Sequence, residues 1–223
     1  MDVKIHIGLD EPHQIAYDVC KHSILKFNSR HNLKIFPINY NLVRNYQRKK
    51  DLNESTQFSF ARFWVPWEDN FKGVSIFLDS DFIFLESIDN LIDLYDDRYA
   101  IMCCKHDYIP TNKIKMDGKK QTNYPRKNWS SLIIFNNNHS SHNHLTPLTC
   151  NSSSGEYLHR FKWLKDGEIG SLPLEWNWLV DWYSETDSFK PKALHYTEGG
   201  PWLENYKNCS YNIEWNKLKD EIG

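Results

Sequence analysis

The chain has 223 residues, of which 40% are hydrophobic and 25% charged, a composition that favours one folded domain and excludes an intrinsically disordered chain. A formal net charge of −2 excludes the strongly basic surface of a nucleic-acid-binding protein, so no nucleic acid is expected as a partner. The longest apolar runs have the length of a strand, which predicts that the sequence holds no transmembrane segment. With no apolar secretion signal near its start and five cysteines outside any CxxC pair, the chain is expected to be cytoplasmic with reduced thiols.

The predicted elements alternate between strands and helices in the first half of the chain. In chain order, we predict a strand at residues 3–9, a helix at 13–27, a strand at 33–38, a helical segment at 55–71 that is broken near Pro66, a strand at 74–78, a helix at 88–95 and a strand at 99–104. A long surface loop at residues 106–127 precedes a strand at 132–135, a polar connection at 136–154, a helix at 157–164 and a last strand at 193–196. The alternation predicts an α/β fold with a mostly parallel sheet.

Two aspartates stand at the end of the most apolar strand. Asp79 and Asp81 follow the apolar run at residues 74–78, and four further apolar residues come after them. Carboxylates in such surroundings are costly to desolvate unless a positive group neutralises them. The carboxyl end of a parallel strand is also where α/β folds bind ligands, and short acidic side chains suit Mg²⁺ or Mn²⁺. A metal that bridges a diphosphate fits this pattern, and a solvated turn or a helix cap is the alternative.

Two other enzyme classes that use paired acids fit less well. Phosphatases of the haloacid dehalogenase type place a D-x-D-x-T motif after a first strand, whereas here Ile83 occupies the Thr position and the strand is internal. Sugar nucleotidyltransferases carry an N-terminal glycine-rich loop with a basic residue. The corresponding region of this chain offers only Gly8, with no base nearby.

Four segments together resemble a known family, the retaining GT-A glycosyltransferases of the glycogenin and lipopolysaccharide-galactosyltransferase type, with small bacterial and viral relatives. They are residues 5–10 with Ala16 and Tyr17, residues 59–63 around Arg62, the D-x-D motif at residues 79–81, and residues 195–202 with the His…Gly-Gly-Pro-Trp pattern. The resemblance covers most of the chain. It implies a single GT-A (Rossmann-like) domain over residues 1–223, in which residues 1–105 bind the nucleotide sugar and residues 106–223 form the acceptor-side half.

The resemblance also implies roles for individual residues. Asp79, Asp81 and His195 are expected to bind the metal, Mn²⁺ or Mg²⁺, and Arg62 joins the two aspartates as the catalytic set. The nucleotide sugar is expected to contact Gly8, Leu9, Asp10, Tyr17, Arg62, Ser80, Lys127, Trp129, Gly199, Gly200 and Trp202. The donor sugar or acceptor is expected at Glu175, Trp176 and Asn177, with Trp176 as a stacking platform. For Arg62, a structural salt bridge remains the alternative.

The expected reaction moves a hexose from a nucleotide diphosphate sugar, with UDP as the expected nucleotide, to a hydroxyl of a glycan, a lipid-linked sugar or a protein. By resemblance, the anomeric configuration is retained. One departure matters, because Gly200 stands where the family has a Lys before Pro-Trp. The cation for the leaving diphosphate must then come from Arg62, Arg126 or Lys127.

A non-catalytic nucleotide- or sugar-binding module is the alternative, suggested by the nine Trp residues and the missing Lys. A second group of potential ligands, His139, His142 and His144, lies in a polar stretch without a Cys or carboxylate. We expect it to be a solvated loop rather than a metal site.

Overall fold

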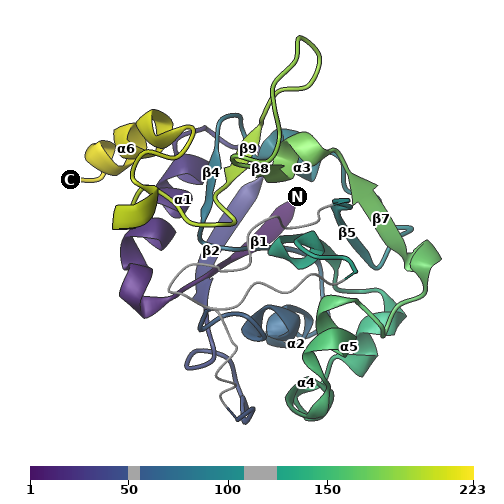
Figure 1. The fold of residues 1–223 in the computed structure, drawn as a ribbon. Coiled ribbons are helices and arrows are strands. Elements are labelled where there is room, and N and C mark those ends of the chain that lie inside the picture. The colour runs from purple at the N-terminus through teal and green to yellow at the C-terminus, as the bar shows by residue number, and fades with distance from the viewer. Residues whose placement is uncertain (50–55, 108–124) are drawn as a thin grey trace.

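A six-stranded sheet forms the centre of the computed structural model, which describes residues 1–49, 56–107 and 125–223 (Figure 1). The strands follow the order β2-β1-β3-β6-β5-β7. Their bounds are β1 (Asp2–Gly8), β2 (Asn32–Ile38), β3 (Val74–Leu78), β5 (Ile101–Cys104), β6 (Leu132–Asn136) and β7 (Ile169–Leu172). Strand β6 is antiparallel to both neighbours and the other pairs are parallel, which confirms a mostly parallel α/β sheet.

Both faces of this sheet are buried. Consecutive strand residues point to opposite sides, so that in β3 Phe77 joins one buried cluster while Ile76 and Leu78 join another. The same alternation places Ile133 and Ile134 of β6 in different clusters. Because each face needs apolar residues, the central strands are continuous apolar runs in the sequence.

A second, three-stranded sheet includes the strand that follows the acidic pair. It has the order β4-β9-β8, with β4 (Phe82–Phe84), β8 (Trp178–Leu179) and β9 (Ala193–His195). Strand β4 pairs antiparallel with β9, and β8 pairs parallel with β9. This sheet pairs β4, from the middle of the chain, with β9, near its end. The acidic pair directly precedes β4, and His195 is the last residue of β9.

Helices cover the sheet on both faces. They are α1 (Gln14–Leu25), α2 (Val65–Glu68), α3 (Asp89–Ile92), α4 (Pro147–Ser152), α5 (Gly155–His159) and α6 (Asn212–Glu221). Short 3₁₀ segments are η1 (Glu11–His13), η2 (Ala61–Trp64), η4 (Trp129–Ser131), η5 (Ser140–His144), η6 (Asp166–Glu168), η7 (Leu174–Asn177) and η8 (Glu204–Tyr206). Within the described ranges, we find no helix with the length and apolar character needed to cross a bilayer.

Helices α1 and α6 lie side by side at one edge of the molecule (Figure 1). His22 Nε2 of α1 and Nζ of Lys26, the residue directly after α1, lie 2.9 and 2.7 Å from the carboxylate of Glu221 on α6. The five cysteines are all free, and four of them are buried.

Several predicted elements differ from the structure. The described part of the helical segment predicted at residues 55–71 consists of turns, η2 and the short α2. The predicted break near Pro66 is confirmed, since Pro66 lies in the first turn of α2, and the segment ends at Asn70 and Phe71, whose φ angles are 54° and 56°. The helix predicted at 157–164 starts earlier, at Gly155, and gives way before Phe161, whose φ is 53°. Strands β4, β7 and β8 and helix α6 were not predicted, and most of the loop predicted at 106–127 lies outside the described residues.

Candidate metal centre

Two aspartates and one histidine meet at the carboxyl end of β3. Asp79 and Asp81 flank a tight turn between β3 and β4, and His195 is the last residue of β9. One potential ligand atom from each side chain lies within 4.8 Å of the others. The sequence prediction that these three side chains converge is therefore confirmed as geometry.

Strand pairing explains why residues so distant in sequence meet. The β4–β9 register places Phe82 opposite His195, and the two rings stack with centroids 4.4 Å apart and an interplanar angle of 14°. The turn is anchored on both sides, since Asp79 N donates to Ser131 O at 2.9 Å and Tyr196 N donates to the main-chain oxygen of Asp81 at 2.9 Å. The acidic turn thus has little freedom to move away from the imidazole.

The carboxylates lack enough donors for their charge. The Oδ1 atoms of Asp79 and Asp81 are buried and accept no hydrogen bond from the described residues. Asp79 Oδ1 forms an ion pair with Arg62 Nη1 at 2.9 Å, and Asp81 Oδ1 lies 3.4 Å from His195 Nε2. Two neighbouring, largely buried carboxylates with one arginine as a counter-charge favour a further cation, and two carboxylates with an imidazole form a reasonable ligand set for Mn²⁺ or Mg²⁺. The residues therefore fit a divalent ion.

The pKa shifts of Asp79 and Asp81 also favour a bound cation. Burial raises the pKa of Asp79 to about 6, and the repulsion from Asp81 adds to this rise while Arg62 opposes it. Burial also acts to raise the pKa of Asp81, but attraction to His195 outweighs it and the net pKa is lowered. Neighbouring carboxylates resist ionising together, and a bound cation removes that penalty.

Arg62 lies at the acidic pair and also supports the local fold. Its Nε donates to Ser59 O at 3.0 Å and its Nη1 to Ser130 O at 2.7 Å, and its guanidinium carbon lies 4.8 Å from the Phe77 ring centroid. The side chain is only 6% exposed. The structure therefore contains the salt bridge that was the alternative interpretation, at the place where a donor phosphate was expected.

The predicted nucleotide-binding residues near the start of the chain take part in packing. A Cβ atom on Gly8 would lie 2.5 Å from the Phe58 ring, so glycine is needed for this contact. Leu9 is partly buried against the core, and Asp10 Oδ1 accepts a hydrogen bond from Gln57 N at 3.0 Å. Tyr17 is buried, and burial raises its pKa to about 12. Contacts of these residues with a nucleotide remain predictions.

The glycine pair near the chain's end makes room for aromatic rings. A Cβ on Gly200 would lie 1.9 Å from the Trp202 ring, and one on Gly199, whose φ is +139°, would lie 2.7 Å from Tyr206. The Trp202 ring packs 5.6 Å from that of Trp215. The described contacts of this segment are thus with protein, and close approach to a phosphate remains a prediction.

The residues predicted to bind a sugar differ in their surroundings. Trp176 is 1% exposed and packs near Phe84, so its indole has no open face on which a sugar could stack. Glu175 is partly exposed at the same turn. Asn177 is fully buried and contacts His195, a partnership that the sequence did not indicate.

Three further predicted residues lie in the turn after β3 or in or beside η4. Ser80 is buried between the two aspartates, and Lys127 is 3% exposed just before η4. The Trp129 indole donates to His106 O at 3.0 Å, and the Arg126 guanidinium carbon lies 5.4 Å from its ring centroid. Roles in donor binding remain predictions for these residues.

The second group of histidines, at residues 139–144, forms no metal site among the described residues. The stretch with three histidines was predicted to be a solvated loop, which is wrong for His142: it is buried in η5 and its Nε2 donates to Ala100 O at 2.8 Å. The only cluster of three metal-ligating side chains in the described part of the chain is the one at Asp79, Asp81 and His195.

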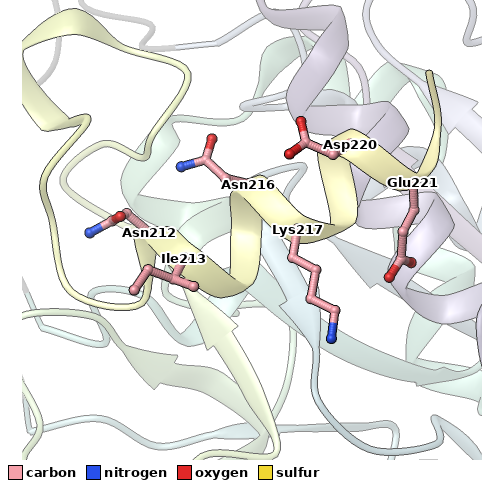
Figure 2. A pocket seen from close by; sticks show the side chains of 6 residues that line it. All are labelled: Asn212, Ile213, Asn216, Lys217, Asp220 and Glu221. Carbon is pink, nitrogen blue, oxygen red and sulfur yellow. The ribbon is translucent and has the colours of Figure 1, made fainter.

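The surface near helix α6 carries two depressions. One, of about 550 Å³, is lined by Asn212, Ile213, Asn216, Lys217, Asp220 and Glu221 (Figure 2). The other lies between α1 and α6. Neither is lined by a residue of the metal centre, and the polar side chains in Figure 2 do not converge on a common point.

Comparison with known proteins gives one sequence relative. The chain is 44% identical over 218 residues to Protein CDI of Arabidopsis thaliana, a match that covers 95% of this chain and 84% of that protein. No protein-family model matches the chain.

Solved structures share the fold at low sequence identity. The glycosyltransferase GlyE of Streptococcus pneumoniae matches with a TM-score of 0.62 and 16% identity, over 97% of this chain and 59% of GlyE. The galactosyltransferase LgtC, in complex with donor and acceptor sugar analogues, matches with a TM-score of 0.62 and 13% identity, over 99% and 96% of the two chains. A glycosyltransferase involved in glycosylation of the major capsid of PBCV-1 matches with a TM-score of 0.55 and 14% identity, over 99% and 100%.

The fold is therefore that of the GT-A glycosyltransferases, including those like LgtC, as the sequence resemblance predicted. The chain spans only 51–61% of the length of the longer neighbours, GlyE and the bifunctional WbbM.

Proposed function

The chain belongs to the family of Protein CDI, and we propose that it is a metal-dependent glycosyltransferase that moves a hexose from a nucleotide diphosphate sugar to a hydroxyl acceptor. UDP is the proposed nucleotide, and retention of the anomeric configuration is the proposed stereochemistry. Both rest on the resemblance of the sequence motifs to the retaining GT-A enzymes. The acceptor is a hydroxyl of a glycan, a lipid-linked sugar or a protein.

One observation carries the proposal. Two largely buried carboxylates and an imidazole bring their ligand atoms within 4.8 Å of one another, with Arg62 as the one ion-pair partner of Asp79 among the described residues, at the carboxyl end of a central strand in a GT-A fold. Ligands of α/β sheets bind at this edge. A purely structural acidic turn would be expected to satisfy its oxygens with backbone or side-chain donors.

The side chains have separable tasks in this proposal. Asp79, Asp81 and His195 hold the ion, which supplies Lewis-acid stabilisation of a departing nucleotide diphosphate when bound. Arg62, fixed by two carbonyl oxygens, keeps a positive charge beside the same edge and is oriented toward anionic groups. Because the Pro-Trp segment carries Gly200 in place of a Lys, Arg62 is the proposed protein cation for the leaving group.

A donor screen tests the function. Purified protein is incubated with UDP- and GDP-hexoses, each with Mn²⁺ or with EDTA, and release of the nucleotide diphosphate is measured. The proposal predicts Mn²⁺-dependent release from at least one donor. Binding of a donor in a thermal-shift assay without turnover of any donor would instead support the non-catalytic binding module.

A further inference from the structure

The imidazole of His195 has a partner on the side away from Asp81. His195 Nδ1 lies 2.8 Å from Asn177 Oδ1, and both side chains are buried. An amide oxygen can only accept a hydrogen bond, so in neutral His195 the proton lies on Nδ1. In this neutral, metal-binding form, Nε2, the atom 3.4 Å from Asp81 Oδ1, presents its lone pair toward the acidic pair; only the imidazolium, protonated on both nitrogens, attracts Asp81 as described above.

The orientation of the Asn177 amide is set by a second pair of groups. Asn177 Nδ2 lies 2.9 Å from Ser131 Oγ and 3.4 Å from Asn128 O, and Ser131 Oγ donates its own proton to Asn128 O at 2.7 Å. Because the Ser131 hydroxyl proton is donated to Asn128 O, Ser131 Oγ acts as the acceptor for Asn177 Nδ2. This fixes the amide nitrogen toward Ser131 and the amide oxygen toward His195.

We propose that Asn177 is a positioning residue of the metal centre, which holds His195 in the tautomer whose Nε2 lone pair faces Asp81 and a bound divalent ion. Ser131 and the Asn128 carbonyl in turn hold the Asn177 amide. This inference rests on the proposed function for the role of the ion, and it reassigns Asn177, whose polar atoms are used within the protein, from sugar contact to support of a ligand.

The physical consequence of losing this partner is specific. Without the Asn177 acceptor, the imidazole proton moves to Nε2, where the Asp81 carboxylate accepts it. The lone pair that a metal needs is then no longer available. Partners that orient a ligating histidine typically contribute about 10- to 100-fold to metal affinity.

The tautomer can be read directly by ¹⁵N NMR of the histidine ring in metal-free protein, at a pH at which His195 is neutral. We expect Nδ1–H in the unmodified protein and in Asn177→Asp, which keeps an acceptor oxygen. In Asn177→Leu we expect a shift to Nε2–H, together with a Mn²⁺ dissociation constant raised by about 10- to 100-fold in titration calorimetry. Ser131→Ala, a milder change, is expected to shift the tautomer in the same direction to a smaller extent.

Asn137→Leu provides a matched control. Asn137 is 1% exposed and its Nδ2 donates to Ser75 Oγ at 2.7 Å, an equivalent buried Asn–Ser contact near the start of β3 rather than at its end. Its loss should lower stability without changing the His195 tautomer or Mn²⁺ affinity.

Two results would overturn the positioning role. One is an unmodified protein with the proton on Nε2. The other is Nδ1–H and unchanged Mn²⁺ affinity in both Asn177→Leu and Ser131→Ala. The NMR measurement uses neither donor nor metal, so it is independent of the proposed function. Absence of sugar transfer with Nδ1–H in place would reject the function and leave the tautomer assignment standing.

Discussion

His195 Nε2 and Asp81 Oδ1 lie 3.4 Å apart although 114 positions separate them in the sequence, counting from 81 to 195. The antiparallel pairing of β4 with β9 creates this contact by placing Phe82 beside His195. The candidate metal centre is therefore a property of the strand register, and a change in that register would separate its ligands.

Neutralising either aspartate should remove metal binding. In Asp79→Asn and Asp81→Asn, the ligand set loses one negative charge and an anionic oxygen, and we expect no measurable Mn²⁺ binding by titration calorimetry. Asp89→Asn is the matched control, because Asp89 is also a buried carboxylate but binds Ser29 and the backbone of Arg30. Mn²⁺ affinity unchanged in both site variants would reject the assignment.

Arg62 should matter for both stability and donor binding. Arg62→Ala leaves Asp79 buried without its ion-pair partner, which should lower the free energy of unfolding by about 3 kcal/mol. It should also weaken binding of a UDP-sugar. Arg48 also donates to backbone carbonyls, those of Cys150 and Ser153, but has no carboxylate among its described partners, so Arg48→Ala should cost stability alone. Equal donor affinity in the two variants would return Arg62 to a purely structural role.

Gly200 should tolerate no side chain. Because a Cβ would lie 1.9 Å from the Trp202 ring, Gly200→Ala forces that ring to move, at an expected cost of about 1–3 kcal/mol in chemical denaturation. Gly167→Ala is the control, since nothing lies within 4 Å of a Cβ at that position. If both variants unfold at the same denaturant concentration, the packing argument for Gly200 is wrong.

Buried histidine should make the protein less stable in mild acid. Burial lowers the pKa of His142 from 6.5 to about 4, so the unfolded chain binds a proton between these values and the folded protein does not. The stability contributed by neutral His142 is present above pH 6.5 and is lost as the pH falls to 4, by at most about 3 kcal/mol.

The variant His142→Gln keeps a donor for Ala100 O and does not titrate. Its free energy of unfolding should therefore fall less than that of the unmodified protein between pH 6.5 and 4. His144→Gln, at an exposed position, serves as the control and should follow the unmodified protein. The same pH dependence in all three proteins would contradict the prediction.

The sequence predicted the central strands well because their burial on both faces leaves continuous apolar runs. Residues 74–78 coincide with β3, and the acidic pair directly after them was readable for the same reason. The segment around Arg62 was predicted to be helical up to a break near Pro66, whereas it forms turns and the 3₁₀ segment η2. Residues 58–66 are buried without a polar face, so their apolar spacing reflects packing in the core rather than an amphipathic helix.

The features that the sequence did not predict depend on contacts between residues far apart in the chain. His195 entered the predicted site through family resemblance, and its position follows from pairing between two three-residue strands. The Asn177–Ser131 contact joins residues 46 positions apart and has no local pattern. Trp176, predicted as a sugar platform, faces the interior because neighbouring elements cover it, which depends on tertiary packing alone.

The most direct test of the account is to locate the ion itself. Crystals grown with Mn²⁺ and UDP would be measured at the manganese absorption edge, where anomalous scattering marks the metal. The account predicts a strong peak bound by Asp79, Asp81 and His195 and in contact with the diphosphate. A peak bound by other residues, or none at this site with UDP present, would contradict it.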